Sequence, residues 1–304
     1  MGQSLRRNPM LQKEAPILRG TLSGELRACL LEAIPADTDA LKTLGFEEHV
    51  DHPSVPGHNY MEGYFHAVSA SLGVRVTSVH PRLGCRLDRM AAPSVLVAFC
   101  EAFRRDNSDL FQRLRSDLLS HQNNFCLANL IERRMHFADL SIQVHWGDAV
   151  LRDDVAWHVD APNSFLHLAV GLSGKRCLHA RRSVVNGSVS KNCLIGGSDD
   201  REVFPMQPGD VYLSAPCCFP HAVEYEACSW DDRVVAIQIR LLLSEDEMFN
   251  TLGTHETALD SDPQGGTAAI VFRQIEAQMS SGLVMPSLAK VTAVLRELQA
   301  GIAK

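Results

Sequence analysis

The sequence predicts an α+β fold in which a β-rich core is preceded and followed by helices. Two observations lead to this prediction. From Phe137 onward, short runs rich in Val, Ile and Leu are separated by Gly, Pro, Asp and Ser, which is typical of an all-β sandwich or barrel. Before and after that region, apolar residues recur every three or four positions, as they do in amphipathic helices.

The region 1–135 is expected to be a helical support for the core. Ser23 is a candidate N-cap, because a hydroxyl just before an apolar run can accept a hydrogen bond from the first helical turn. In chain order we expect helices at 25–31 and 37–44, a turn-rich loop at 49–60, a helix at about 61–72, and two or three helices between 93 and 134.

The region 136–243 is expected to be the β core, and 244–304 returns to helices, most clearly at 286–302. The polar run 181–202 is too long for a tight hairpin, which makes it a candidate lid loop. The expected strands lie at 138–146, 155–160, 164–172, 175–180, 210–214, 220–227 and 233–243.

Composition limits the class of protein. The chain has 304 residues, a formal net charge of −7 and 45% hydrophobic residues, which fits a single globular domain and excludes a disordered chain. The negative balance argues against general nucleic-acid binding, so we expect a small-molecule partner. No apolar run is long enough to span a membrane, and the first residues lack a secretory apolar region. We therefore expect a cytoplasmic protein whose nine cysteines are free thiols, in an oligomeric state that stays open.

The pair His158 and Asp160 is the first candidate for chemistry. Residues i and i+2 of a strand point to the same face, so the imidazole and the carboxylate are expected side by side inside the barrel. A second copy of the pattern, His49 and Asp51, lies among turn residues. We interpret that copy as part of a loop or a helix cap.

His221 is the next candidate, because it opens an alternating run. Alternation puts His221, Val223 and Tyr225 on one face of the expected strand. Two imidazoles and one carboxylate on one side of a metal form the facial triad of non-haem Fe(II) enzymes. His158, Asp160 and His221 are therefore the predicted metal ligands and catalytic residues.

Arg233 is the candidate for binding an anion. It precedes an alternating run in which Val235, Ile237 and Ile239 share its face, and that apolar face is expected to be the core. A cation that opens a core-facing series needs a buried anion, either a side chain or a ligand. Arg240 falls on the opposite face, and we interpret it as an exposed or edge residue.

The order of these motifs resembles the Fe(II)/2-oxoglutarate-dependent oxygenases. The resemblance covers roughly residues 136–243. It implies a double-stranded β-helix, which is a jelly-roll or cupin-like core, with iron held by the predicted triad. The motifs that carry it are His158-x-Asp160, Pro208-Gly-Asp210, His221 and Arg233.

The resemblance also implies an anchor and an activity. Arg233 would bind the distal carboxylate of 2-oxoglutarate; some branches place that anchor on an earlier strand as a lysine, so Lys175 and Arg176 are second candidates. The implied enzyme is a dioxygenase that uses Fe(II), 2-oxoglutarate and O2 to hydroxylate a C–H bond of a small or amino-acid-like substrate, releasing succinate and CO2. Two alternatives stay open: a cupin-like metalloenzyme that does not use 2-oxoglutarate, and a non-catalytic binding module on the same barrel.

Overall fold

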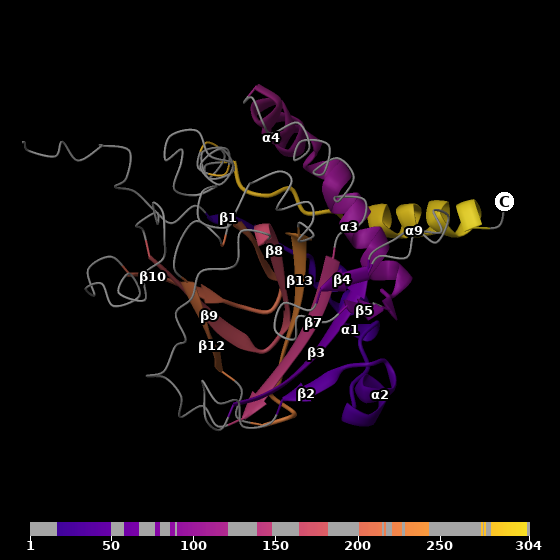
Figure 1. Cartoon of the computed structure of the whole chain (residues 1–304), viewed down its shortest axis with the longest axis vertical. Coiled ribbons are helices and arrows are strands. Elements are labelled where there is room, and N and C mark those ends of the chain that lie inside the picture. The colour runs from indigo at the N-terminus through magenta and orange to yellow at the C-terminus, as the bar shows by residue number, and fades with distance from the viewer. Residues whose placement is uncertain are drawn as a thin grey trace, which may run out of the picture.

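The computed structural model shows three layers, in which helices cover one face of a large sheet and a small sheet faces the other (Figure 1). The residues that the structure describes are 17–49, 58–66, 77–79, 86–88, 90–120, 139–147, 164–181, 201–214, 216, 221–226, 229–242, 275, 277 and 281–302.

The large sheet has the strand order β1-β11-β8-β13-β7-β3-β2, with β6 paired to β3. The small sheet has the order β10-β9-β12, and β4 pairs with β5 apart from both. The strands that precede residue 136 in the sequence are β1 (Ile17–Thr21), β2 (Glu47–His49), β3 (His58–His66), β4 (Thr77–Val79), β5 (Arg86–Asp88) and β6 (Met90–Ala91). The later strands are β7 (Asp139–Gly147), β8 (Ser164–Ser173), β9 (Lys175–Arg181), β10 (Arg201–Met206), β11 (Asp210–Ser214), β12 (His221–Glu226) and β13 (Val234–Leu242).

Three antiparallel pairs are nested in the sequence: β9 with β10, β8 with β11, and β7 with β13. Nested pairs divided between two facing sheets are the pattern of a jelly roll. This arrangement fits the predicted jelly-roll core, and β7, β8, β9, β11, β12 and β13 lie close to the predicted ranges, whereas β10 was not predicted. The strand predicted at 155–160 falls outside the described residues.

The described helices are α1 (Gly24–Glu32), α2 (Thr38–Thr43), α3 (Ser94–Asp106), α4 (Ser108–Ser120) and α9 (Leu288–Ile302). Ser23 caps α1 as predicted, because its hydroxyl accepts a hydrogen bond of 3.2 Å from the Leu26 amide. Asp37 caps α2 in the same way, with a bond of 2.7 Å from the Ala40 amide. None of these helices is long and apolar enough to cross a membrane.

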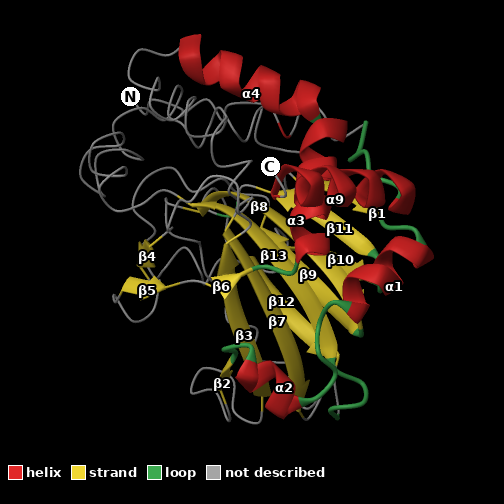
Figure 2. Cartoon of the chain, turned by 90° about the vertical axis from the view of Figure 1, so that its right-hand side faces the viewer, coloured by secondary structure: helices red, strands yellow, loops and turns green. Residues whose placement is uncertain are grey.

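The apolar core lies between the large sheet and the helices, which stand in front of the strands in Figure 2. On β13, Val235, Ile237 and Ile239 are buried on this side, as the alternation predicted. Leu96 and Phe99 of α3 belong to the same core. Each Å² of apolar surface removed from water stabilises the folded state by about 25 cal/mol. This layer is therefore the main source of stability.

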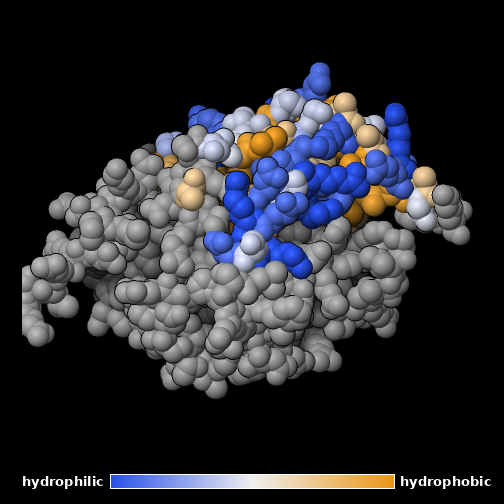
Figure 3. Space-filling model, turned by 90° about the horizontal axis from the view of Figure 1, so that it is seen from above, coloured by the Kyte–Doolittle hydropathy of each residue, from blue (hydrophilic) through white to orange (hydrophobic). Residues whose placement is uncertain are grey.

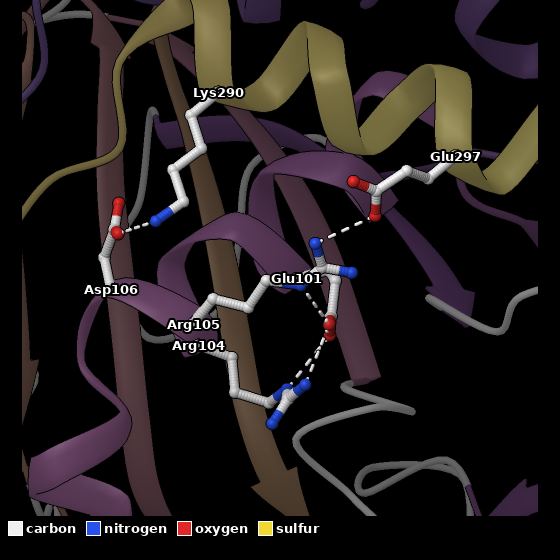
Figure 4. Close-up of polar contacts among 6 residues, drawn as sticks. All are labelled: Glu101, Arg104, Arg105, Asp106, Lys290 and Glu297. Carbon is white, nitrogen blue, oxygen red and sulfur yellow. Dashed lines mark hydrogen bonds and ion pairs between the residues drawn. The ribbon is translucent and has the colours of Figure 1, made fainter.

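Helix α9 packs on α3. Val291 and Val294 of α9 are buried and belong to the apolar core. Ionic pairs border the contact between α3 and α9 in Figure 4: Arg105 reaches Glu297 at 2.9 Å, and Lys290 pairs with Asp106. Glu101 is shared by Arg104 and Arg105, both at 2.8 Å. Seen from above, the described residues form a mostly hydrophilic surface that includes some apolar side chains (Figure 3).

The region before residue 136 differs from the prediction of a helical support. It supplies β1, β2 and β3 to the large sheet, so the loop predicted at 49–60 is flanked by strand on both sides, and the helix predicted from 61 is wrong. Met61 and Phe65 are both buried on the core side of β3. A spacing of four fits one helical turn and also one face of a strand, which explains the error.

Candidate active site

The space between the two sheets is lined by polar side chains. Gln238 of β13 is on the face opposite Ile237, and its neighbours in register are Ser141 and Ala169. That face of the large sheet points at the small sheet, because the His145 ring stacks on Tyr225 of β12 with centroids 3.7 Å apart. The buried polar residues of this inner face are Glu62, Ser141, His145, His167, Ser214 and Gln238.

The small sheet presents its own inner face by the same alternation. Tyr225 is opposite Arg176 in the register of β12 with β9, and His221 is opposite Ala180. Arg176, Tyr225 and His221 therefore share one face, as the parity of the sequence predicted for His221, Val223 and Tyr225. His221 is buried at the first position of β12.

The hairpin between β8 and β9 positions Arg176. Gly174 takes a φ of +66° at the turn, a conformation that favours glycine because it has no Cβ. Lys175 follows and is exposed, and Arg176 points inward one residue later. A Cβ placed on Gly171 of β8 would lie 3.7 Å from Nη2 of Arg176, so the guanidinium reaches across to the large sheet.

Arg176 is 2% exposed, and in the described part of the chain its Nε, Nη1 and Nη2 atoms have no hydrogen-bond partner. Its guanidinium lies over the Tyr212 ring, 5.7 Å from the centroid, which stabilises the charge but accepts none of its in-plane N–H bonds. An unpaired buried charge is costly. The arrangement is therefore suited to an anionic ligand.

Arg233 lies elsewhere. It precedes β13, its Nη1 donates to the Trp230 carbonyl at 3.0 Å, and its guanidinium lies 5.0 Å from the Trp230 ring centroid. Trp230 in turn packs against Trp146 and donates to the Ala36 carbonyl. Because Ala36 lies between α1 and α2, Arg233 is on the helix side of the large sheet. The structure does not bring it together with His221.

The remaining members of the predicted site are His158 and Asp160, which lie outside the described residues, as does 182–200 of the candidate lid. The first two residues of β10, Arg201 and Glu202, replace the end of that predicted loop with strand. Within the described ranges no cluster of three metal-binding side chains occurs. His221 is thus the one predicted ligand whose position is described, and its inner-face place suits a ligand role.

A hydrogen-bonded row crosses four strands of the large sheet and was not predicted. Gln143 of β7 donates to the Glu62 carboxylate of β3 at 2.8 Å. Gln238 of β13 donates to the Gln143 carbonyl oxygen at 3.1 Å, and its own carbonyl oxygen bonds to Nε2 of His167 on β8. We call these four residues the polar row. The alternating polar positions of β7, at Ser141, Gln143 and His145, were the signal for it.

The donor and acceptor of each hydrogen bond in the polar row follow from the Glu62 carboxylate at one end of the row. The Glu62 carboxylate only accepts, so Gln143 donates to it and offers its carbonyl oxygen to Gln238. Gln238 thereby commits its amide nitrogen to Gln143, and its carbonyl oxygen must accept from His167. This fixes His167 with a proton on Nε2.

Comparisons with known proteins give a limited result. No family model and no curated protein matches the chain. Among solved structures, hydroxypropylphosphonic acid epoxidase from S. wedmorenis matches at 12% identity and a TM-score of 0.23, over 34% of this chain and 42% of that chain. A variant of Bacillus subtilis oxalate decarboxylase matches at 17% identity and 0.23, over 37% and 25%. The chain thus spans less than half of the length of each of these proteins, and a likeness of this size carries no inference about function.

Proposed function

We propose that this protein is an Fe(II)- and 2-oxoglutarate-dependent dioxygenase that hydroxylates a C–H bond of a small polar substrate and releases succinate and CO2. The observation that carries the proposal is the buried, unpaired guanidinium of Arg176 on the inner face that it shares with His221. Motif order in the sequence supplies the rest, since His158, Asp160 and His221 have the residue types of the facial triad.

A carboxylate is the best partner for Arg176. A guanidinium binds a carboxylate through two parallel hydrogen bonds, and such charge-assisted pairs are about twice as strong as neutral ones. Arg176 and the register partner of His221 are four residues apart on β9, or about 13 Å along the strand. That separation leaves room for a short dicarboxylate between the two side chains. Arg176 thus replaces Arg233 as the proposed anchor.

The roles of the chain's own residues follow from this arrangement. His158, Asp160 and His221 would hold iron, and Arg176 would orient 2-oxoglutarate by its distal carboxylate. Iron and 2-oxoglutarate, when bound, supply the oxidative decarboxylation that makes O2 reactive. The jelly roll provides a rigid frame, and Tyr212 keeps the Arg176 guanidinium in place.

Anaerobic titration of Fe(II)-loaded protein with 2-oxoglutarate tests the proposal. A weak visible charge-transfer band and uncoupled succinate release are expected from the wild type. Arg176→Met should remove the stabilisation by 2-oxoglutarate, and it should raise the Tm of ligand-free protein because an unpaired buried charge is gone. Arg233→Met is the matched control and should keep 2-oxoglutarate binding.

The opposite results are equally specific. If folded, iron-loaded wild type shows neither the band nor succinate, the proposed function is wrong. Turnover of O2 without succinate would indicate a metalloenzyme that does not use 2-oxoglutarate. Loss of 2-oxoglutarate binding in Arg233→Met but not in Arg176→Met would return the anchor role to Arg233.

A further inference from the structure

Ser141 is a second orphaned polar group between the sheets. It is 3% exposed, and its hydroxyl has no hydrogen-bond partner among the residues that the structure describes. It is the third residue of β7, in register with Gln238 on one side and Tyr64 on the other. Leaving a buried hydroxyl unpaired is costly, so the Ser141 hydroxyl is suited to a ligand.

The polar row explains why Ser141 is left without a partner. Gln238 is its neighbour in register, but the amide nitrogen of Gln238 is bonded to Gln143 and its carbonyl oxygen to His167. Gln143 is turned the other way, toward Glu62. The side-chain amides of Gln238 and Gln143 are therefore engaged in hydrogen bonds within the polar row, and the Ser141 hydroxyl beside them stays available.

Ser141 is too far from Arg176 to share one carboxylate with it. The guanidinium reaches β8 at Gly171, and β13 lies between β8 and β7. Two strand spacings amount to about 10 Å. A carboxylate bound at Arg176 therefore leaves Ser141 unoccupied, and a second molecule, or a second polar group, has to satisfy it.

We propose that Ser141 and the polar row form a subsite for the hydrogen-bonding group of the prime substrate, and that this group is an alcohol or a carboxamide on a compact molecule. This inference rests on the proposed function, which assigns Arg176 to 2-oxoglutarate. An acyl chain is a poor occupant, because it would leave the Ser141 hydroxyl unsatisfied. Free amino acids with hydroxyl or amide side chains fit this chemistry.

The test compares Ser141→Ala with Ser173→Ala. Ser173 is a structural hydroxyl, which donates to the Arg233 carbonyl at 3.0 Å and accepts from the Val235 amide at 3.2 Å. Without ligand, Ser141→Ala should keep or raise the Tm, whereas Ser173→Ala should lower it. A clear fall in Tm for Ser141→Ala would show a structural partner and overturn the proposal.

Binding is then measured on anaerobic Fe(II) protein with 2-oxoglutarate, by thermal shift. The probes are L-serine, L-threonine, L-asparagine and L-glutamine, with L-alanine, L-valine and L-leucine as apolar counterparts. At least one polar probe should stabilise the wild type and bind Ser141→Ala about tenfold more weakly. Equal shifts in both proteins, shifts from the apolar probes alone, or no shift at all would overturn it. Uncoupled succinate release by both proteins separates that outcome from failure of the proposed function.

Discussion

The guanidinium of Arg176 lies over the face of the Tyr212 ring, with Cζ 5.7 Å from the ring centroid. The ring stabilises the positive charge through its electron-rich face. It cannot accept the N–H bonds that lie in the guanidinium plane, and these have no acceptor in the described residues. Tyr212 thus holds the Arg176 guanidinium in place, while the N–H groups at the edge of the guanidinium stay available to a carboxylate.

The space beside Gly171 is the first point to test. A Cβ there would lie 3.7 Å from Nη2 of Arg176 and 3.5 Å from the Gln207 and Asp210 carbonyl oxygens, which are ordinary contacts. Gly171→Ala should therefore keep 2-oxoglutarate affinity. Gly171→Leu should crowd the guanidinium and weaken 2-oxoglutarate binding about tenfold or more, since overpacking costs about 1–3 kcal/mol. Thermal shifts with 2-oxoglutarate measure this, and equal affinity in both variants would contradict the position of Arg176.

The polar row makes a prediction about His167. At neutral pH its proton should be on Nε2, because Gln238 presents a carbonyl oxygen to it. Long-range ¹H–¹⁵N spectra of histidine-labelled protein identify the tautomer directly. Glu62→Gln should allow the row to reverse and populate the Nδ1 tautomer, because an amide can donate as well as accept.

A matched control is available on the other face of the small sheet. Glu224 contacts Nε2 of His179 at 3.2 Å, so Glu224→Gln should alter the His179 signals and leave those of His167 unchanged. An Nδ1-protonated His167 in the wild type would show that the direction of the polar row is wrong.

Local alternation predicted much of this arrangement from the sequence. The inward direction of His221 and the shared face of Val235, Ile237 and Ile239 were both correct, because strand parity depends only on neighbours. Which face receives the helices and which receives the second sheet is a long-range property. The sequence therefore placed the anchor on the face of Arg233, although that side of β13 meets the helices.

The sequence also could not predict which of two adjacent basic residues is buried. Lys175 and Arg176 are adjacent basic residues, and the sequence cannot tell which is exposed until the turn at Gly174 sets the parity. The β3 strand was missed for a related reason, since the spacing of Met61 and Phe65 fits two periodicities. Helices α1 and α2 were predicted well, because Ser23 and Asp37 define their starts locally.

The turn at Gly174 should not tolerate a side chain. Its φ is +66°, and a Cβ would lie 2.6 Å from Cγ2 and 2.8 Å from Cα of Val234. Gly174→Ala should lower the free energy of unfolding by about 2–4 kcal/mol through backbone strain and this clash. Gly24→Ala is the control, because no atom lies within 4 Å of a Cβ there and alanine favours the helix. Urea unfolding of both variants tests this, and equal stabilities would refute the tight turn.

The thiol of Cys100 makes stability depend on pH. Burial inside α3 raises the pKa of Cys100 from 9.0 to about 12, so the folded state keeps a proton that the unfolded state loses first. The free energy of unfolding should therefore fall as the pH rises above 9, by about 2 kcal/mol up to about pH 10.5, since one pKa unit is worth about 1.4 kcal/mol. Cys100→Ala should lack this component, whereas Cys29→Ala, at a half-buried thiol, should keep it. Urea unfolding from about pH 8 to pH 10.5 measures the difference between variants, and parallel curves for wild type and Cys100→Ala would show that Cys100 does not titrate as a buried thiol.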